Sequence, residues 1–142
     1  MNRHELVLAA LAAAQENATF SPVQVQKLFF LIDREAAALV GGPHFDFRPY
    51  DYGPFDSAVY GVLTSLEHEG FVQSLPSGRY RLYSLTPEGC QQGSRLLSTL
   101  GNNARAYLEQ VTTWVRRLSF AQLVAAIYNK YPDMKVNSVF RG

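Results

Sequence analysis

The chain has 142 residues, enough for one domain with its own hydrophobic core, and 47% of them are hydrophobic. A single cysteine excludes an internal disulfide, and a net charge of +1 excludes a uniformly basic or acidic chain. The longest apolar N-terminal stretch, Leu6 to Ala14, is shorter than a membrane span and follows charged residues. We therefore expect a cytoplasmic protein without a membrane segment, forming a single domain over residues 1–142.

The charges divide unevenly along the chain. Residues 1–78 hold four basic and nine acidic side chains, a net of −5, and residues 79–142 hold nine basic and three acidic ones, a net of +6. This asymmetry fits a basic face for nucleic acid, an acidic face for a basic protein, head-to-tail association, or two solvated faces that differ by chance.

Two helices are predicted in the first forty residues. Apolar residues at helical spacing predict a helix over residues 3–15. A second helix begins at Pro22, because Ser21–Gln24 supplies an N-cap, a first-turn proline and a capping-box glutamine. We expect it to run to about Val40. Its segment Gln26–Ile32 is apolar around nearly its whole circumference, which is typical of a helix enclosed by neighbours.

Five aromatic rings follow within residues 45–55, where two prolines and a glycine prevent a long regular element. We call residues 45–55 the aromatic connector. Phe45 and Phe47 alternate like a short strand that runs into a turn, and we expect the rings to pack on the second helix. The phenylalanines are expected in the core, whereas Tyr50 and Tyr52 fit the core or an exposed surface equally well.

The remaining elements are predicted from apolar periodicity, caps and turn residues. In chain order, we expect a helix through Val59–Leu66 ended by Gly70, a hairpin of residues 71–75 and 79–85 joined by Pro76–Gly78, a helix from Pro87 to about Leu100, helices near residues 104–118 and 120–131, and an irregular tail over 132–142. Gly89 and Gly93 lie one turn apart and would let another element approach the fourth helix closely.

The order helix, helix, helix, hairpin, helix is typical of a winged-helix domain. We therefore predict a mainly α fold: a winged-helix-like part over residues 1–100 with one small β-hairpin, and a C-terminal extension of two helices over residues 101–142.

Two segments together carry a resemblance to a known family. They are Gln26–Leu31 (QKLFFL) and Tyr50–Phe55 (YDYGPF) followed by Val59-Tyr60, and Leu85-Thr86-x-x-Gly89 comes later with fitting spacing. In order and spacing they resemble the SocA-like antitoxin (Panacea) domains and the related, uncharacterised YwgA-like bacterial proteins. The resemblance covers roughly residues 20–100. It implies a mostly helical fold whose members often bind a partner toxin and neutralise it or deliver it for degradation.

The connector is the predicted protein-binding site, through Tyr50, Asp51, Tyr52, Gly53 and Pro54. Rigid aromatic side chains lose little conformational entropy on docking, so they recur as interface anchors. We expect a non-enzymatic interaction module that binds a protein partner, and the resemblance implies that this partner is a toxin.

An enzyme is not expected, because the sequence has no nucleophile elbow, phosphate loop or metal-binding spacing. We accordingly expect no cofactor and no metal. Cys90 and His68 could meet in space, but a lone cysteine is more often a small core residue. The carboxylates of Asp46, Asp51 and Asp56 could converge, but turn capping is the commoner role.

A winged-helix DNA-binding regulator is the alternative function. The helix that normally enters the major groove falls at residues 54–69, which hold acidic residues and no lysine or arginine. Repulsion from phosphates disfavours that mode of docking. Arg79 and Arg81 of the hairpin could contact nucleic acid instead.

A homodimer is also predicted. Tyr107, Val111, Trp114 and Leu118 belong to an apolar seam in the fifth helix, and with the sixth helix they hold more apolar surface than a small core can cover. Two-fold dimers are the commonest closed assemblies, so part of residues 104–131 should form the interface. In the alternative, both helices pack wholly onto the first two helices of their own chain.

Overall fold

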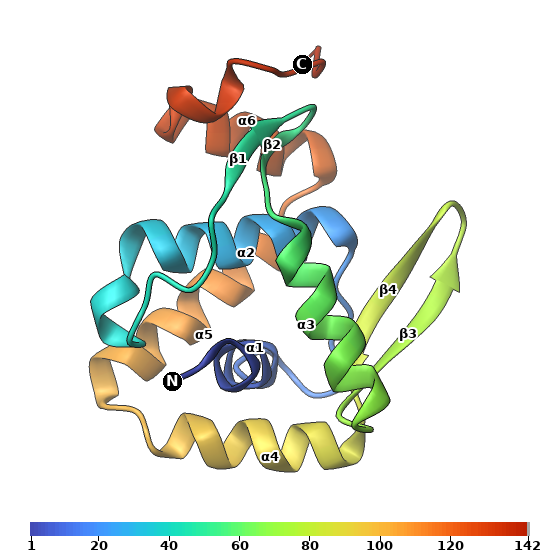
Figure 1. Ribbon diagram of the computed structural model, residues 1–142, viewed down its shortest axis with the longest axis vertical. Helices are drawn as coiled ribbons and strands as arrows, with labels where there is room; N and C mark the ends of the chain where they lie inside the picture. The colour runs from blue at the N-terminus through green and yellow to red at the C-terminus, as the bar shows by residue number, and fades with distance from the viewer. Residues whose placement is uncertain (142) are drawn as a thin grey trace.

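Helix α1 (Arg3–Ala12) lies at the centre of the computed structural model, which describes residues 1–141. Figure 1 shows α1 end-on, with other helices arranged around it, and every residue from Leu6 to Leu11 is buried. The predicted mainly α fold with a β-hairpin is confirmed. The other elements, in chain order, are α2 (Pro22–Glu35), the 3-10 turn η1 (Ala37–Leu39), β1 (Arg48–Tyr50), β2 (Gly53–Phe55), α3 (Ser57–His68), β3 (Val72–Ser77), β4 (Tyr80–Leu85), α4 (Pro87–Ser98), α5 (Asn102–Arg117), α6 (Phe120–Lys130) and the 3-10 turn η2 (Pro132–Lys135).

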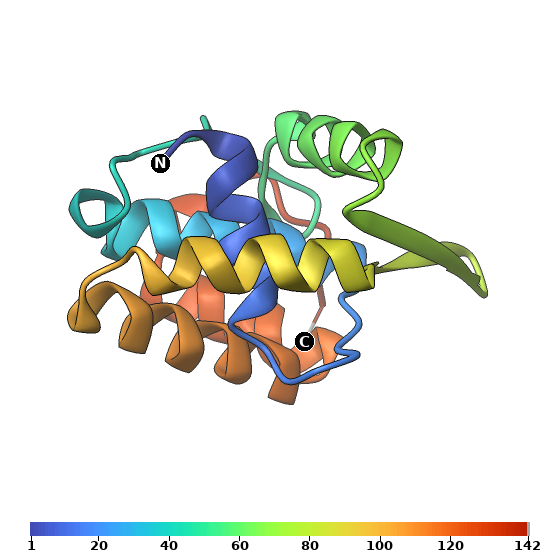
Figure 2. The ribbon, with the colours of Figure 1, turned by 90° about the horizontal axis from the view of Figure 1, so that it is seen from below.

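Two glycines let α4 lie close to other parts of the chain, Gly93 where α4 crosses α1 (Figure 2) and Gly89 where α4 meets the segment before β3. A Cβ atom on Gly93 would lie 2.6 Å from the carbonyl oxygen of Leu8 and 2.7 Å from the Cβ of Ala12. A Cβ on Gly89 would collide with the backbone of Phe71. At both glycines the contacts of an added Cβ atom would be shorter than side chains in proteins tolerate, so the predicted close approach is confirmed.

The first two helices are shorter than predicted. α1 ends at Ala12 rather than at residue 15, and α2 ends at Glu35 rather than near Val40. The carboxylate of Asp33 accepts 2.8 Å hydrogen bonds from the amides of residues 44 and 45. These bonds hold the following chain back against α2, so the helix cannot continue in line.

The enclosed segment of α2 is as predicted. Every residue from Val25 to Ile32 is buried, including the polar Gln26 and Lys27. The N-cap Ser21 and the capping-box Gln24 both form their expected hydrogen bonds, which explains why α2 begins at Pro22.

The β1–β2 hairpin was not predicted. Its strands pair Arg48 with Phe55 and Pro49 with Pro54, and the turn consists of Asp51 and Tyr52. Proline can sit in both strands because each of them is an edge strand, which leaves one side of the backbone without a ladder partner. The prolines that suggested a turn in the sequence therefore lie in a minimal antiparallel ladder.

The strand predicted at Phe45–Phe47 was wrong. The amide of Phe45 donates to the carboxylate of Asp33, and the amide of Asp46 donates to that of Asp56 at 2.7 Å. With their amides bonded to side chains, these residues cannot form a ladder. Phe45 is nevertheless buried, as expected, and Phe47 packs against the core.

The β3–β4 hairpin projects from the helical body (Figure 1). Its turn falls at residues 78 and 79, because Pro76 pairs with Arg81 inside the ladder instead of lying in the predicted loop. At its base, the backbone of Phe20 exchanges two 2.8 Å hydrogen bonds with Tyr83 of β4. The segment between α1 and α2 thus anchors the hairpin at one end.

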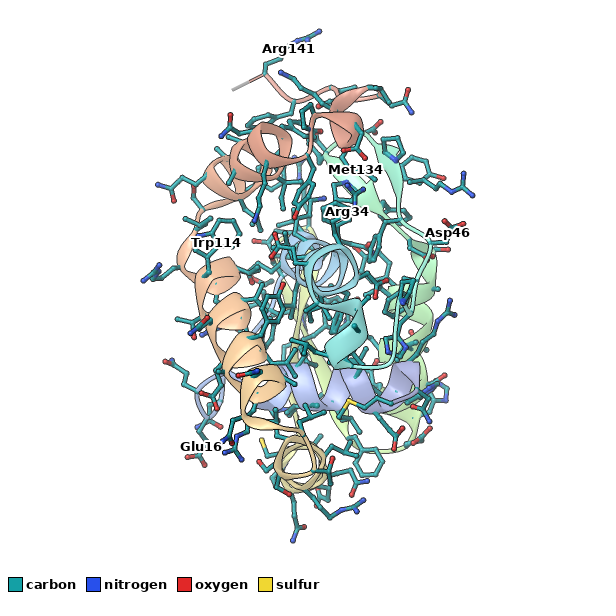
Figure 3. The ribbon with its side chains drawn as sticks, turned by 90° about the vertical axis from the view of Figure 1, so that its left-hand side faces the viewer. Glu16, Arg34, Asp46, Trp114, Met134 and Arg141 are labelled. Carbon is teal, nitrogen blue, oxygen red and sulfur yellow. The ribbon has the colours of Figure 1, made fainter. Side chains whose placement is uncertain are left out.

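The C-terminal helices complete the core. α5 packs on α1 and α2, α6 packs on α2, and η2 covers the β1–β2 hairpin. Figure 3 places Arg34, near the end of α2, beneath the buried Met134 of η2. The tail is less irregular than predicted because η2 is helical, and Gly142 lies outside the described residues. Within residues 1–141, helices with the length and apolarity to cross a membrane are absent.

Candidate functional site

The two segments that carry the family resemblance meet in space. The side-chain amide of Gln26 donates to the carbonyl oxygen of Asp56 at 3.0 Å and accepts from the Asp56 amide at 2.9 Å. Next to it, the Nζ atom of Lys27 donates to the carbonyl oxygen of Pro54 at 3.2 Å. These three bonds fix the aromatic connector to α2 in one orientation, because each ends on a buried or partly buried group.

A groove of about 930 Å³ opens where the connector, α2, α6 and the β3–β4 hairpin come together. We call it the tyrosine groove, after the four tyrosines in its lining. Its principal lining side chains are Lys27, Tyr50, Asp51, Tyr52, Tyr60, Tyr80, Arg116, Leu118, Phe120 and Leu123. The volume lies within the range of clefts that bind small ligands.

The floor of the tyrosine groove contains a buried lysine. Lys27 is 3% exposed, and burial lowers the pKa of its amine to about 7 from an ordinary value of 10.5. Beside it, a Cβ on Gly53 would lie 3.7 Å from the Cε of Lys27 and 3.2 Å from the Tyr128 ring. Gly53 also has a φ of 99°, which strongly favours glycine.

Exposed aromatic rings form the rim of the groove. Tyr50 is 53% exposed, and Tyr52 and Phe120 are each 45% exposed. The rings of Tyr52 and Phe120 meet edge to face with centroids 5.2 Å apart, and Tyr50 packs in the same way on Phe55 at 5.1 Å. Because the rings support one another, they are held in place before any partner arrives.

The C-terminal tail braces the tip of the connector. The amide of Val139 donates to the carbonyl oxygen of Asp51 at 2.9 Å, and the Asn137 side chain donates to that of Pro49 at 3.0 Å. Ser138 joins both sides, since its hydroxyl lies 2.6 Å from the Tyr128 hydroxyl and 3.2 Å from the Asp51 carbonyl. The tip is therefore fixed from below by α2 and α6 and from above by the tail.

The predicted protein-binding residues divide into two groups. Tyr50, Asp51 and Tyr52 are exposed at the tip, whereas Gly53 and Pro54 are buried against Lys27 and shape the backbone. Lys27, Arg116 and Phe120 were missed. The sequence signal for Lys27 is a lone lysine inside an otherwise apolar, enclosed helical segment; Arg116 and Phe120 reach the groove through long-range packing, which has no local signal.

The candidate nucleic-acid residues lie on the β3–β4 hairpin. Arg79 is exposed in the turn, and Arg81 is held by Ser74, whose hydroxyl and carbonyl oxygens accept bonds of 2.8 Å each. The exposed face of α3 presents Thr64 and Glu67 and carries no lysine or arginine. The arginines and α3 therefore do not form one continuous basic surface.

The apolar seam of α5 faces largely inward. Val111 is buried, and the Tyr107 hydroxyl donates to the Leu31 carbonyl oxygen at 3.2 Å and to Glu35 at 3.0 Å. Trp114 and Leu118 are half-buried. Figure 3 shows Trp114 on the outer side of the body, where it lines a groove of about 660 Å³ between α5 and α6. A homodimer through this seam stays a prediction, which sedimentation of the purified protein tests.

The carboxylates considered for chemistry act as backbone caps. One oxygen of Asp56 accepts from the Ala58 amide at 2.9 Å as the N-cap of α3, and the other accepts from the Asp46 amide. Asp51 lies apart, at the hairpin tip. Among residues 1–141, the structure has no group of three or more histidine, cysteine, aspartate or glutamate side chains that could hold a metal ion.

Comparison of the chain with protein-family models, curated proteins and solved structures finds no match. The resemblance to SocA-like domains thus stays a prediction based on the two sequence segments.

Proposed function

We propose that the protein is a non-enzymatic binding module that recognises a protein partner through the tyrosine groove. The observation that carries the proposal is the aromatic rim, in which Tyr50, Tyr52 and Phe120 are exposed although each belongs to a tightly fixed backbone. Large rings held in one conformation bury area on binding with little loss of entropy. Rings that served the core alone would be covered like Phe45.

The resemblance to SocA-like antitoxins supports a specific form of this function. In that form the partner is a toxin in the cytosol, and binding neutralises it or delivers it for degradation. The groove lies where the two resembling segments are joined by the bonds from Gln26 and Lys27, so the segments and the proposed surface coincide.

The test is to capture partners from a lysate of the native host with immobilised protein and then reconstitute each candidate pair from purified components. The double variant Tyr50→Ser and Tyr52→Ser should bind the reconstituted partner at least about ten-fold more weakly, because aromatic anchors contribute about 2 kcal/mol or more each at an interface. Leu39→Ser is the matched control, since Leu39 is 43% exposed but lies in η1, outside the groove.

Two results would contradict the proposal. One is a partner whose affinity is unchanged by the double variant while the control variant weakens it. The other is the absence of any protein partner together with tight, sequence-specific binding to duplex DNA that is lost in Arg79→Ser and Arg81→Ser, which would favour the DNA-binding regulator.

A further inference from the structure

The lining of the tyrosine groove holds more basic than acidic side chains. Lys27 on the floor and Arg116 on the wall are the cations of the lining, and its carboxylate, Asp51, stands at the exposed hairpin tip. Lys27 belongs to residues 1–78, whose net charge is −5, and Arg116 belongs to residues 79–142, whose net charge is +6. The groove lining therefore brings together two basic side chains and one acidic side chain from both halves of the chain.

Lys27 is held without a counter-charge. Its Nζ donates to the Pro54 carbonyl oxygen, and within residues 1–141 no carboxylate oxygen lies at salt-bridge distance from it. An ammonium group has three N–H donors, so further hydrogen bonds can be formed on the groove side. Burying a cation without an anion is unfavourable, in line with its lowered pKa, and a carboxylate brought by a partner would offset part of that penalty.

Arg116 is positioned as a second cation. Its Nε donates to the Thr19 carbonyl oxygen at 3.1 Å, and its guanidinium lies over the Phe20 ring at 5.5 Å. Among the described residues, hydrogen bonds to its two terminal nitrogens are absent. A guanidinium fixed along one edge and open along the other can bind a carboxylate with a defined orientation.

The groove also suits apolar side chains next to those carboxylates. Leu118, Leu123 and the rings of Tyr60 and Phe120 provide apolar walls. A nucleic acid backbone needs a row of exposed cations spaced along its phosphates, whereas here one cation is buried and the other is braced by a ring. The chemistry therefore matches an acidic peptide with large apolar side chains better than a nucleic acid.

We propose that the tyrosine groove binds an acidic segment of the partner protein, with one carboxylate at the Nζ of Lys27 and a neighbouring one at Arg116. Phenylalanine or leucine side chains of the same segment pack against the exposed rings of Tyr52 and Phe120. This inference rests on the proposed function and specifies the chemistry that the surface recognises.

Titrating ¹⁵N-labelled protein with a capped peptide that alternates aspartate and phenylalanine tests the proposal. The same peptide with asparagine in place of aspartate is the control ligand. We expect saturable shifts of amide resonances in residues 50–55 and 118–123 with the acidic peptide, and about ten-fold weaker binding or none with the amide peptide.

The charge requirement is tested with Lys27→Met, which keeps an unbranched side chain only one atom shorter and removes the amine. This variant should bind the acidic peptide about ten-fold more weakly than the wild type does, and its affinity for the amide peptide should not change. Arg95→Met is the control variant, because Arg95 is exposed on α4 and outside the groove lining. If Lys27→Met alters the spectrum globally, Arg116→Met provides the same comparison from the groove wall.

Equal binding of the two peptides, or shifts that map outside the groove, would overturn the inference. So would self-association that buries the groove and excludes both peptides. A partner that needs the Tyr50 and Tyr52 rings but binds Lys27→Met and Arg116→Met as tightly as the wild type would also overturn it, and would leave the proposed function standing.

Discussion

The two hairpins of residues 1–141 use antiparallel pairing for different purposes. β1–β2 has three residues in each strand, yet it is joined to α2 by Lys27, covered by η2 and braced by the tail at Val139. β3–β4 has six residues in each strand but is anchored at its base and exposes Leu75 and Tyr80, each 52% accessible. The shorter hairpin is the more firmly held.

The two hairpins differ in how their exposed side chains are supported by the rest of the protein. A three-residue hairpin is not stable alone in water, so β1–β2 exists because the helices bury its backbone and bond to it. Its exposed tyrosines therefore stand on a rigid base. The β3–β4 hairpin is anchored at its base, and residues 78–80 at its tip are exposed, so changes near the tip should hardly affect the rest of the protein.

The largest expected effect is a pH dependence that originates at Lys27. Its amine titrates near 7 in the folded protein and near 10.5 in the unfolded chain, so between these values the unfolded state binds the additional proton. Stability should therefore rise with pH, by roughly 1.4 kcal/mol per unit between pH 7 and 9.5, or about 3 kcal/mol in total. Chemical denaturation at several pH values measures this slope.

Lys27→Met is the control for this prediction, because its side chain cannot titrate. The slope should vanish in this variant. The tyrosines with raised pKa values, Tyr60, Tyr83, Tyr107 and Tyr131, lower stability only above about pH 10, outside the chosen window. A slope that survives in Lys27→Met would show that another group causes it.

The next effect is the loss of the bridge between α2 and the connector. Gln26→Ala should lower the free energy of unfolding by about 2 to 3 kcal/mol, because it leaves the backbone amide and carbonyl of Asp56 without partners. Gln73→Ala is the matched change in the second hairpin, where the amide makes a 3.3 Å bond to Ser84 from an exposed position. It should change stability by less than about 0.5 kcal/mol.

Glycine replacement in the two hairpins should give a smaller contrast. Gly53→Ala combines a strained φ of 99° with a 3.2 Å contact to the Tyr128 ring, and should lower stability by about 2 kcal/mol. Gly78→Ala has a φ of 62° but open space around the new methyl group, and should lower it by about 1 kcal/mol. Thermal unfolding of both variants checks the order, and a larger loss for Gly78→Ala would contradict it.

The smallest effect is expected at the tip of the second hairpin. Leu75→Ser and Tyr80→Ser should each change stability by less than about 0.5 kcal/mol, because both side chains are already half accessible. Hydrogen exchange should show the same contrast, with β3–β4 amides near residues 77–80 exchanging faster than those of β1–β2. Protection of residues 77–80 equal to that of β1–β2 would show that the second hairpin is covered.

Local signals predicted the helical part of the fold well. The capping box at Ser21 and Gln24, the glycine that ends α3 at Gly70 and the close approach at Gly93 are all found in the structure. Each of these signals acts within one helical turn of its residue or depends on the absence of a side chain. Each can therefore be predicted from a short stretch of sequence alone.

The candidate site was predicted only in part, for a physical reason. The exposed tip of the connector followed from its composition, but its β-pairing depends on bonds from Gln26 and Lys27, almost thirty residues away. Likewise, Asp33 determines where α2 ends through bonds to residues 44 and 45. Side-chain to backbone bonds over such separations leave no periodic pattern in the sequence.

One binding experiment tests the central claim that the tyrosines at the tip of the first hairpin, and not the arginines of the second, make the recognition contacts. The reconstituted partner and a duplex DNA are each titrated with wild-type protein, with Tyr50→Ser plus Tyr52→Ser, and with Arg79→Ser plus Arg81→Ser. We predict that the affinity for the partner falls at least about ten-fold in the tyrosine variant, whereas the arginine variant binds the partner as tightly as the wild type does. Loss of binding in the arginine variant, with the tyrosine variant unaffected, would contradict the account.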